Sequence, residues 1–73
     1  MIRVKIEVEQ HEDHWQVRGC YVNINNDTIR QILSGEEYRN KDAAVAEMKR
    51  RALKYLKEEG RVETEDQIEW SIL

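Results

Sequence analysis

Residues 2 to 9 alternate between apolar and charged side chains without a break, and this pattern limits the fold more than any other feature. Ile2, Val4, Ile6 and Val8 share one side of an extended chain, and the charged residues between them share the other. An alternation with a period of two is typical of a β-strand buried on one face only. We therefore expect a sheet that is covered on one side.

A second strand follows the short stretch HEDH, because the period of two resumes at Trp15. We expect these two strands to form an antiparallel hairpin. Trp15 and Val17 lie on one face, whereas strict alternation puts Val22 and Ile24 on the other. A β-bulge near Gly19 would let the strand change sides and keep its apolar residues on one face.

The segment of residues 28–38 is compatible with two structures. A strong turn signal, Asn-Asn-Asp at residues 25–27, precedes it. Its first three aliphatic residues are at helical spacing, which would make a short helix capped by Asp27. We favour a third strand that reaches Tyr38, because β-branched residues flank the turn and a lone helix of about eight residues is marginal.

The surest helix spans residues 41–59. Asn40 can cap its start, Asp42 lies in the first turn, no proline or glycine occurs from residue 43 to 59, and Gly60 stands where a left-handed C-cap belongs. Its apolar stripe consists of Val45, Met48, Ala52 and Leu56, widened by Leu53 and Tyr55. Lys49 lies beside this stripe, where it would extend to solvent at the edge or meet a carboxylate.

The chain closes with a further alternating segment, QIEWSIL. We therefore predict one α+β domain over residues 1–73, an antiparallel sheet with one long helix packed on one face. The element order is β-β-β-α-β, with β-β-α-α-β as the alternative if residues 28–38 are helical. Trp15 and Trp70 would share the core face under the helix, or one of them would serve an interface.

The charge balance excludes a general attraction to polyanions. Lys and Arg number 12 and Asp and Glu number 15, a net charge of −3, which draws in neither nucleic acid nor anionic lipid. The sequence holds no apolar run near the ~18 residues of a membrane span and no signal-peptide pattern. Cys20 is the single cysteine and forms no internal disulfide. We expect a soluble cytoplasmic protein with no membrane partner.

His11 and His14, separated by two carboxylates, raise the question of a metal site. Two ligands are too few, since catalytic zinc has three protein ligands and structural zinc four. Cys20 is six residues beyond His14, about 20 Å at ~3.3 Å per residue, and cannot join them. We expect HEDH to turn the chain and predict no metal or other cofactor, leaving open a site formed across a subunit interface.

Catalytic residues are not indicated elsewhere. A lone cysteine in a strand is usually a small buried hydrophobic residue. The three glycines are far apart and form no phosphate-binding loop. No carboxylate pair is set in apolar surroundings that would raise one pKa. We therefore predict that the protein is not an enzyme and has no small-molecule substrate.

The best candidate for a binding site is a basic stripe on the outer face of the helix. It is formed by Arg50, Arg51, Lys54 and Lys57, with Arg61 following. Such a stripe can contact phosphates even on an acidic protein, and these residues are the candidates for binding nucleic acid or a partner. Pairs between Glu47 and Arg51 and between Lys54 and Glu58, each at i,i+4, would instead make it a solvated face.

Two known families share features with this chain. The stretch GEEYRNKDAAVAEMKRRALKYL resembles the closing segment of double-stranded-RNA-binding domains, where a glycine loop and lysines precede an alanine-rich helix. It covers less than a third of the chain and offers Arg39 and Lys41 in place of consecutive lysines. The chain also lacks room for that family's first helix and adds a strand. The order of hairpin, third strand and helix is similar to the partial RNase-H-like modules of HicB-type antitoxins, in layout and not in motif.

The resulting hypothesis is a small non-catalytic interaction module that binds another macromolecule, as a homodimer or with a different protein. A free sheet edge in so small a domain is open to pairing with another chain. The alternative is binding of double-stranded RNA or DNA through the basic outer face of the helix at residues 41–59.

Overall fold

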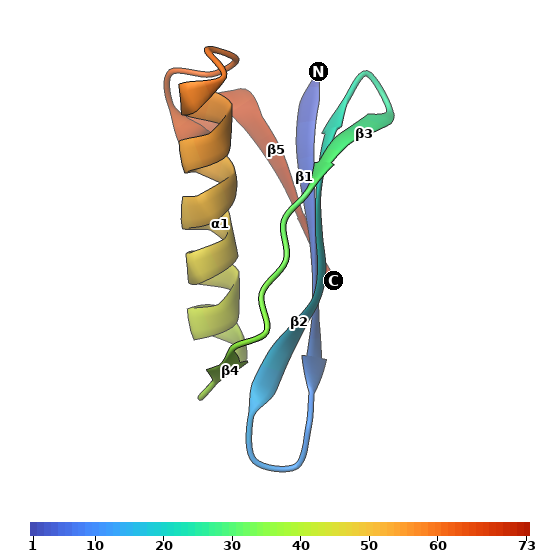
Figure 1. The fold of residues 1–73 in the computed structure, drawn as a ribbon, viewed down its shortest axis with the longest axis vertical. Helices are drawn as coiled ribbons and strands as arrows, with labels where there is room; N and C mark the ends of the chain where they lie inside the picture. The colour runs from blue at the N-terminus through green and yellow to red at the C-terminus, as the bar shows by residue number, and fades with distance from the viewer.

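The computed structural model describes residues 1–73 and shows a mixed five-stranded sheet with one long helix along one face (Figure 1). The α+β class is thereby confirmed. The elements are β1 (Ile2–Gln10), β2 (Trp15–Ile24), β3 (Asp27–Gln31), β4 (Glu37–Tyr38), α1 (Lys41–Glu58), a 3₁₀ turn at Glu65–Gln67 and β5 (Ile68–Ile72). The strand order is β3-β2-β1-β5, with β4 also pairing with β2.

The prediction of a wholly antiparallel sheet is wrong. The strand β5 pairs with β1 in parallel, with Trp70 opposite Val4. The long helix causes this orientation. It runs from the β4 end of the sheet back to the end where β1 begins, so β5 starts beside the start of β1 (Figure 1). A parallel neighbour needs such a crossover connection.

The predicted bulge in β2 is present at Gly19. Glu7 lies opposite Gly19 and Val8 lies opposite Val17, so Arg18 is the extra residue. The bulge keeps the apolar residues before and after it on the face that the helix covers. A side chain at residue 19 would meet the ring of Tyr21, whose hydroxyl would lie 2.6 Å from the added Cβ.

The segment after β2 is a strand, as favoured, and not a helix. Asn25 and Asn26 have φ values of 51° and 73°, the left-handed pair that a two-residue hairpin turn requires. The strand does not run unbroken to Tyr38, because residues 32–36 leave the sheet before β4 rejoins it. This gap lies beside the bulge in β2. Pairing of β2 with β3 ends at Tyr21 and Gln31, and pairing of β2 with β4 begins at Gln16 and Glu37.

The helix ends as its sequence predicts. The Asn40 side chain accepts a hydrogen bond of 2.7 Å from the Ala43 N–H. At the other end Gly60 has φ 71°, its N–H donates to the Lys57 carbonyl at 3.0 Å, and the Arg61 N–H donates to the Leu56 carbonyl at 2.9 Å. This is the Schellman arrangement, and it stops the helix at a defined residue.

The core lies between α1 and the covered face of the sheet. Its members are Val4, Ile6, Cys20, Val22, Met48, Ala52, Leu56, Val62 and Ile68. Trp70 packs against this cluster while staying half-buried, whereas Trp15 is on the same face but outside the cluster. Lys49 meets no carboxylate, and its Nζ lies 5.3 Å from the centre of the Trp70 ring.

Candidate binding groove

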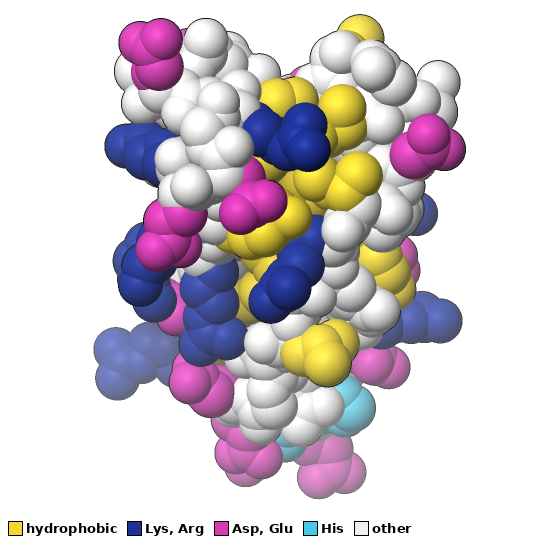
Figure 2. Space-filling model, turned by 45° about the horizontal axis from the view of Figure 1, so that its top comes forward, with side chains coloured by type: hydrophobic (Ala, Val, Ile, Leu, Met, Phe, Trp, Pro, Cys, Tyr) yellow, Lys and Arg dark blue, Asp and Glu magenta, His cyan; other side chains and the backbone are white.

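A shallow groove of about 270 Å³ separates α1 from β3 and the segment that follows it. Its lining combines four cations with one carboxylate and two apolar or aromatic residues: Arg30, Arg50, Arg51, Lys54, Glu58, Ile32 and Tyr55. Figure 2 shows Lys and Arg side chains lying over and beside a strip of hydrophobic side chains on this face. We call this site the basic groove.

Arg30 enters the basic groove because β3 also contains a bulge. Val22 pairs with Arg30 and Asn23 pairs with Thr28, so Ile29 is the extra residue. Since Val22 faces the helix, its partner Arg30 faces the helix as well. The Arg30 guanidinium carbon lies 5.3 Å from the centre of the Tyr55 ring, within the range of a cation–π contact.

Sequence reasoning missed Arg30 because it favoured an unbroken strand over residues 28–38 and did not predict the bulge at Ile29. Ile29 is 38% exposed, whereas Ile32 packs against the core. A signal was available, since residues 29 and 32 cannot face the same side of an unbroken strand. Their spacing therefore required either a helix or a bulge, and a bulge brings Arg30 inward.

Arg51 holds the irregular segment of residues 32–36 against the helix. Its Nε donates to Glu47 at 2.7 Å, its Nη1 donates to the Leu33 carbonyl at 3.2 Å, and its Nη2 donates to Glu36 at 3.3 Å. Three donors of the guanidinium are thus used within the fold. Arg51 forms one wall of the groove and is the least free of its cations.

Glu47 binds two guanidinium groups at once. Arg50 contacts both of its carboxylate oxygens, at 3.0 and 2.8 Å, and Arg51 contacts one of them. Hydrogen bonds from Arg50 and Arg51 lower the pKa of Glu47 to about 2. The predicted Glu47–Arg51 pair is therefore confirmed, and Glu47 is ionised near neutral pH.

The other predicted pair does not form. Lys54 has no ion-pair partner, and Glu58 has none either. Lys57 and Arg61 are exposed and unpaired, but neither lines the groove. The structure thus brings together three of the five predicted residues, Arg50, Arg51 and Lys54, and adds Arg30. The cations of the groove without an ion pair are Arg30 and Lys54.

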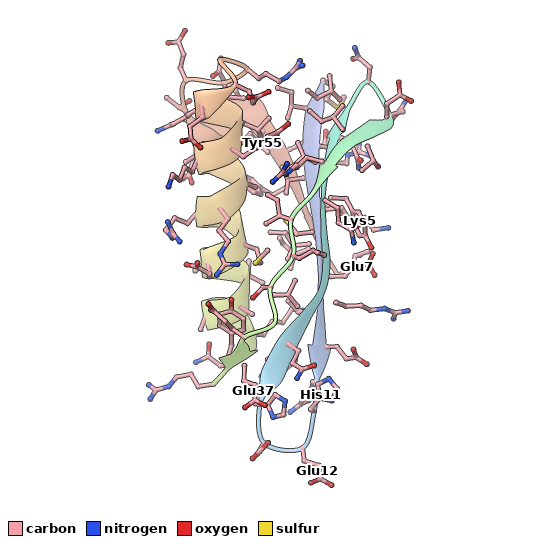
Figure 3. The ribbon with its side chains drawn as sticks, viewed as in Figure 1. Lys5, Glu7, His11, Glu12, Glu37 and Tyr55 are labelled. Atoms are coloured by element: carbon pink, nitrogen blue, oxygen red, sulfur yellow. The ribbon has the colours of Figure 1, made fainter.

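The HEDH stretch connects β1 to β2, and the His11 N–H donates to the His14 carbonyl at 2.8 Å. The two imidazole rings stack with centroids 5.2 Å apart. His14 Nδ1 lies 2.7 Å from Asp13, and this hydrogen bond lowers the pKa of the Asp13 carboxyl. His14 Nε2 lies 3.6 Å from Glu37, which is labelled with His11 in Figure 3. No three metal-binding side chains are arranged to hold an ion.

Cys20 is fully buried in the core beneath α1. Burial raises the pKa of its thiol to about 11, so the group is protonated near neutral pH. Since the thiolate is the nucleophilic form, this environment suppresses cysteine chemistry.

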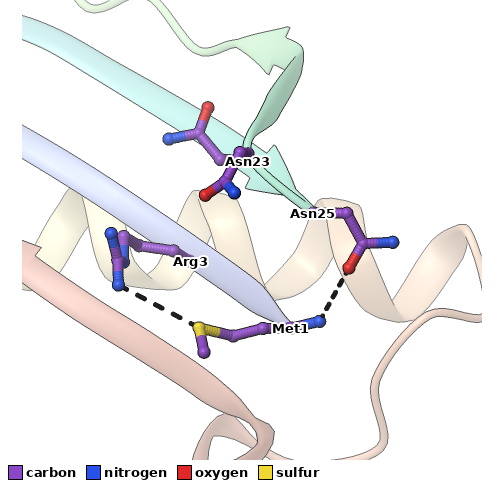
Figure 4. A pocket seen from close by; sticks show the side chains of 5 residues that line it. Met1, Arg3, Asn23 and Asn25 are labelled. Atoms are coloured by element: carbon purple, nitrogen blue, oxygen red, sulfur yellow. Dashed lines mark hydrogen bonds between the residues drawn. The ribbon is translucent and has the colours of Figure 1, made fainter.

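A second pocket, of about 280 Å³, is lined by Met1, Arg3, Asn23, Asn25 and Asn26 (Figure 4). Its charged groups are already engaged. The Met1 amine donates to Asn25 at 3.1 Å, and Arg3 is paired with Glu69 at 2.8 Å. The pocket therefore presents amides more than free charge, in contrast to the basic groove.

Comparison of the chain with protein-family models, with curated proteins and with solved structures finds no match. No helix of the structure is both long enough and apolar enough to cross a bilayer.

Proposed function

We propose that the protein is a non-catalytic interaction module that binds an acidic segment of a partner protein in the basic groove. One observation carries this proposal. Arg30 on β3 and Lys54 on α1 face the same groove without ion-pair partners, and Tyr55 and Ile32 provide an apolar surface between them.

The composition of the groove suits a peptide that carries both carboxylates and an apolar side chain. A carboxylate can accept hydrogen bonds from Lys54, from Arg30 and from the guanidinium donors of Arg50 that Glu47 leaves free. Glu47 also holds Arg50 in a fixed orientation, which reduces the entropy lost on binding. An apolar side chain of the peptide would cover Ile32 and the exposed part of Tyr55.

Nucleic acid is the second candidate, and the unpaired cations Lys54, Lys57 and Arg61 favour it. We rank it lower because the net charge is −3 and Glu36, Glu47 and Glu58 lie around the groove. A long polyanion gains affinity by neutralising many phosphates, and these carboxylates oppose such contacts.

The remaining parts of the proposal concern the oligomeric state, the cellular compartment, and the absence of a cofactor and of catalysis. We propose that the module is a homodimer that works in the cytoplasm and needs no cofactor. The protonated, unpaired thiol of Cys20 fits a reducing compartment. The absence of catalysis is proposed because the core thiol is not ionised and the histidines contact only carboxylates, the side-chain amide of Gln16 and each other.

Fluorescence anisotropy tests the binding proposal. The protein would be titrated at two salt concentrations into labelled peptides rich in Asp, Glu and Leu. Basic peptides of the same length serve as controls, and short double-stranded RNA and DNA are tested in parallel. The double variant Arg30→Gln/Lys54→Gln should lose at least tenfold in peptide affinity, roughly 1.4 kcal/mol. The matched control Lys57→Gln, on the same helix but outside the groove, should bind as the unaltered protein does.

Two results would overturn the proposal. Salt-sensitive binding of nucleic acid that Lys57→Gln also weakens would identify the outer helix face as a nucleic-acid site. Peptide binding that the double variant leaves unchanged would place the docking site elsewhere on the surface.

A further inference from the structure

The strand β5 leaves one edge of the sheet open. Its only neighbour is β1. The Leu73 N–H donates to the Ile6 carbonyl at 2.8 Å, and the Val8 N–H donates to the Leu73 carbonyl at 3.1 Å. Since backbone groups alternate along a strand, residues 69, 71 and 73 bond towards β1. The N–H and C=O groups of Ile68, Trp70 and Ile72 therefore point away from the sheet.

This edge lacks the features that protect an edge strand from pairing. It contains no proline and no bulge, and Glu69 is its only charged residue. The opposite edge differs, because the bulge at Ile29 interrupts β3. The helix packs chiefly against β1 and β2, so that Trp70 and Ile72 on β5 remain only half-buried. Both the backbone and the side chains of β5 are thus incompletely covered.

We infer that β5 is the homodimer interface, pairing antiparallel with β5 of a second copy about a two-fold axis at Trp70. This inference rests on the homodimer of the proposed function and locates its interface, and it is independent of the basic groove. The two sheets would join into one continuous sheet, with both helices on the same face. A two-fold interface of this kind uses the same surface on both subunits.

The sequence of β5 is self-complementary in this register. Ile68 lies opposite Ile72 of the partner subunit, and Trp70 lies opposite Trp70 of the partner subunit. Glu69 lies opposite Ser71 of the partner subunit, so the only charge on the strand meets a hydroxyl. A two-fold axis at residue 69 would instead set two glutamates against each other, which is unfavourable. The axis at Trp70 also pairs all five residues of the strand.

The first test is the solution mass, measured by light scattering over a range of concentrations. The unaltered protein should be a dimer. Ser71→Glu places a carboxylate opposite Glu69 of the partner subunit at two symmetric positions, and should weaken the dimer at least tenfold. Within its own subunit residue 71 is paired with Lys5, so the fold should tolerate the change. Gln31→Glu, with the same charge on the β3 edge, is the control and should leave the dimer intact.

A register-specific cross-link provides the second test. In the double variant Glu69→Cys/Ser71→Cys, each new thiol faces its counterpart across a non-hydrogen-bonded pair, where Cα atoms are about 4.5 Å apart and a disulfide can form. Each of the two symmetric disulfides releases two hydrogens, which one molecule of oxidised glutathione takes up as it is reduced to two molecules of glutathione. We expect a covalent dimer from the double variant and none from either single variant. Within one chain the two Cβ atoms are about 6.6 Å apart, too far to be bridged.

The outcomes separate this inference from the proposed function. Circular dichroism of each variant establishes that it is folded. A dimer that survives Ser71→Glu and yields no cross-link would refute the β5 interface while leaving the homodimer in place. A protein that stays monomeric at every concentration would refute both, without bearing on peptide binding in the groove.

Discussion

The guanidinium of Arg30 lies over the ring of Tyr55, with 5.3 Å between its central carbon and the ring centre. This contact joins β3 to α1 across the basic groove. An exposed cation–π pair contributes about 0.5–1 kcal/mol, and here it also directs the Arg30 charge into the groove. The stability of the fold and the proposed peptide binding therefore both depend on this pair.

We predict that Tyr55→Leu and Arg30→Gln are coupled. Each single variant should lower the free energy of unfolding, and the double variant should lose less than their sum by about 0.5 kcal/mol, because the second change removes no further contact. Urea unfolding of the four proteins measures this coupling. Additive losses would show that Arg30 and Tyr55 do not interact in solution.

The Glu47 carboxylate gives the protein a defined response to acid. Its folded pKa is about 2, against 4.5 for the free group, because Arg50 and Arg51 bind the charged form. A lowered folded pKa means that the stabilisation is complete above pH 4.5 and is lost as the pH falls from there towards 2. The side chain is close to solvent, so screening limits the size of the effect.

The corresponding experiment compares the unaltered protein with Glu47→Gln by urea unfolding from pH 7 to pH 2.5. The difference in unfolding free energy should be largest at pH 7 and should shrink below pH 4.5. Glu58→Gln, which removes an unpaired carboxylate on the same helix, should show no such trend. A difference independent of pH would mean that Glu47 acts through packing and not through its charge.

Local patterns predicted those elements whose signals are contained in a few neighbouring residues. The bulge at Gly19 could be predicted because the apolar residues of this strand are at odd positions before the glycine and at even positions after it. The helix ends could be predicted from Asn40 and Gly60. The parallel pairing of β5 with β1 could not be predicted from local patterns, because strand partners are set by the path of the whole chain. The gap at residues 32–36 depends on the bulge in a neighbouring strand and on Arg51.

The candidate site was predictable to the extent that it lies on the helix. Arg50, Arg51 and Lys54 are close in sequence and therefore close on one helical face. Arg30 comes from a strand and precedes Lys54 by 24 positions, and only the tertiary fold brings it to the same groove as Lys54. The contact of Glu47 with two arginines was predicted only in part, because the Arg50 contact depends on side-chain rotamers.

The Cys20 thiol should be unreactive in the native protein. Burial raises the pKa of its thiol to about 11, and the core prevents access by a reagent. We predict that Ellman's reagent at pH 8 reacts slowly with the folded protein and rapidly after unfolding in urea. The native rate should follow the opening of the core and should rise in destabilised variants such as Leu56→Ala. Fast reaction without denaturant would contradict the burial of β2 beneath the helix.

The turn between β2 and β3 offers a test of whether the segment that follows it is a strand or a short helix. Asn26 has φ 73°, a conformation that costs alanine roughly 1–2 kcal/mol and costs glycine little. We therefore predict that Asn26→Ala lowers the free energy of unfolding by about 1 kcal/mol, whereas Asn26→Gly leaves it unchanged or raises it slightly. If residues 27–33 were instead a helix capped by Asp27, Asn26 would lie before the helix and would not need a positive φ, so Asn26→Ala would cost no more than Asn26→Gly. Urea unfolding of the two variants distinguishes these cases, because only the hairpin turn requires a positive φ at residue 26.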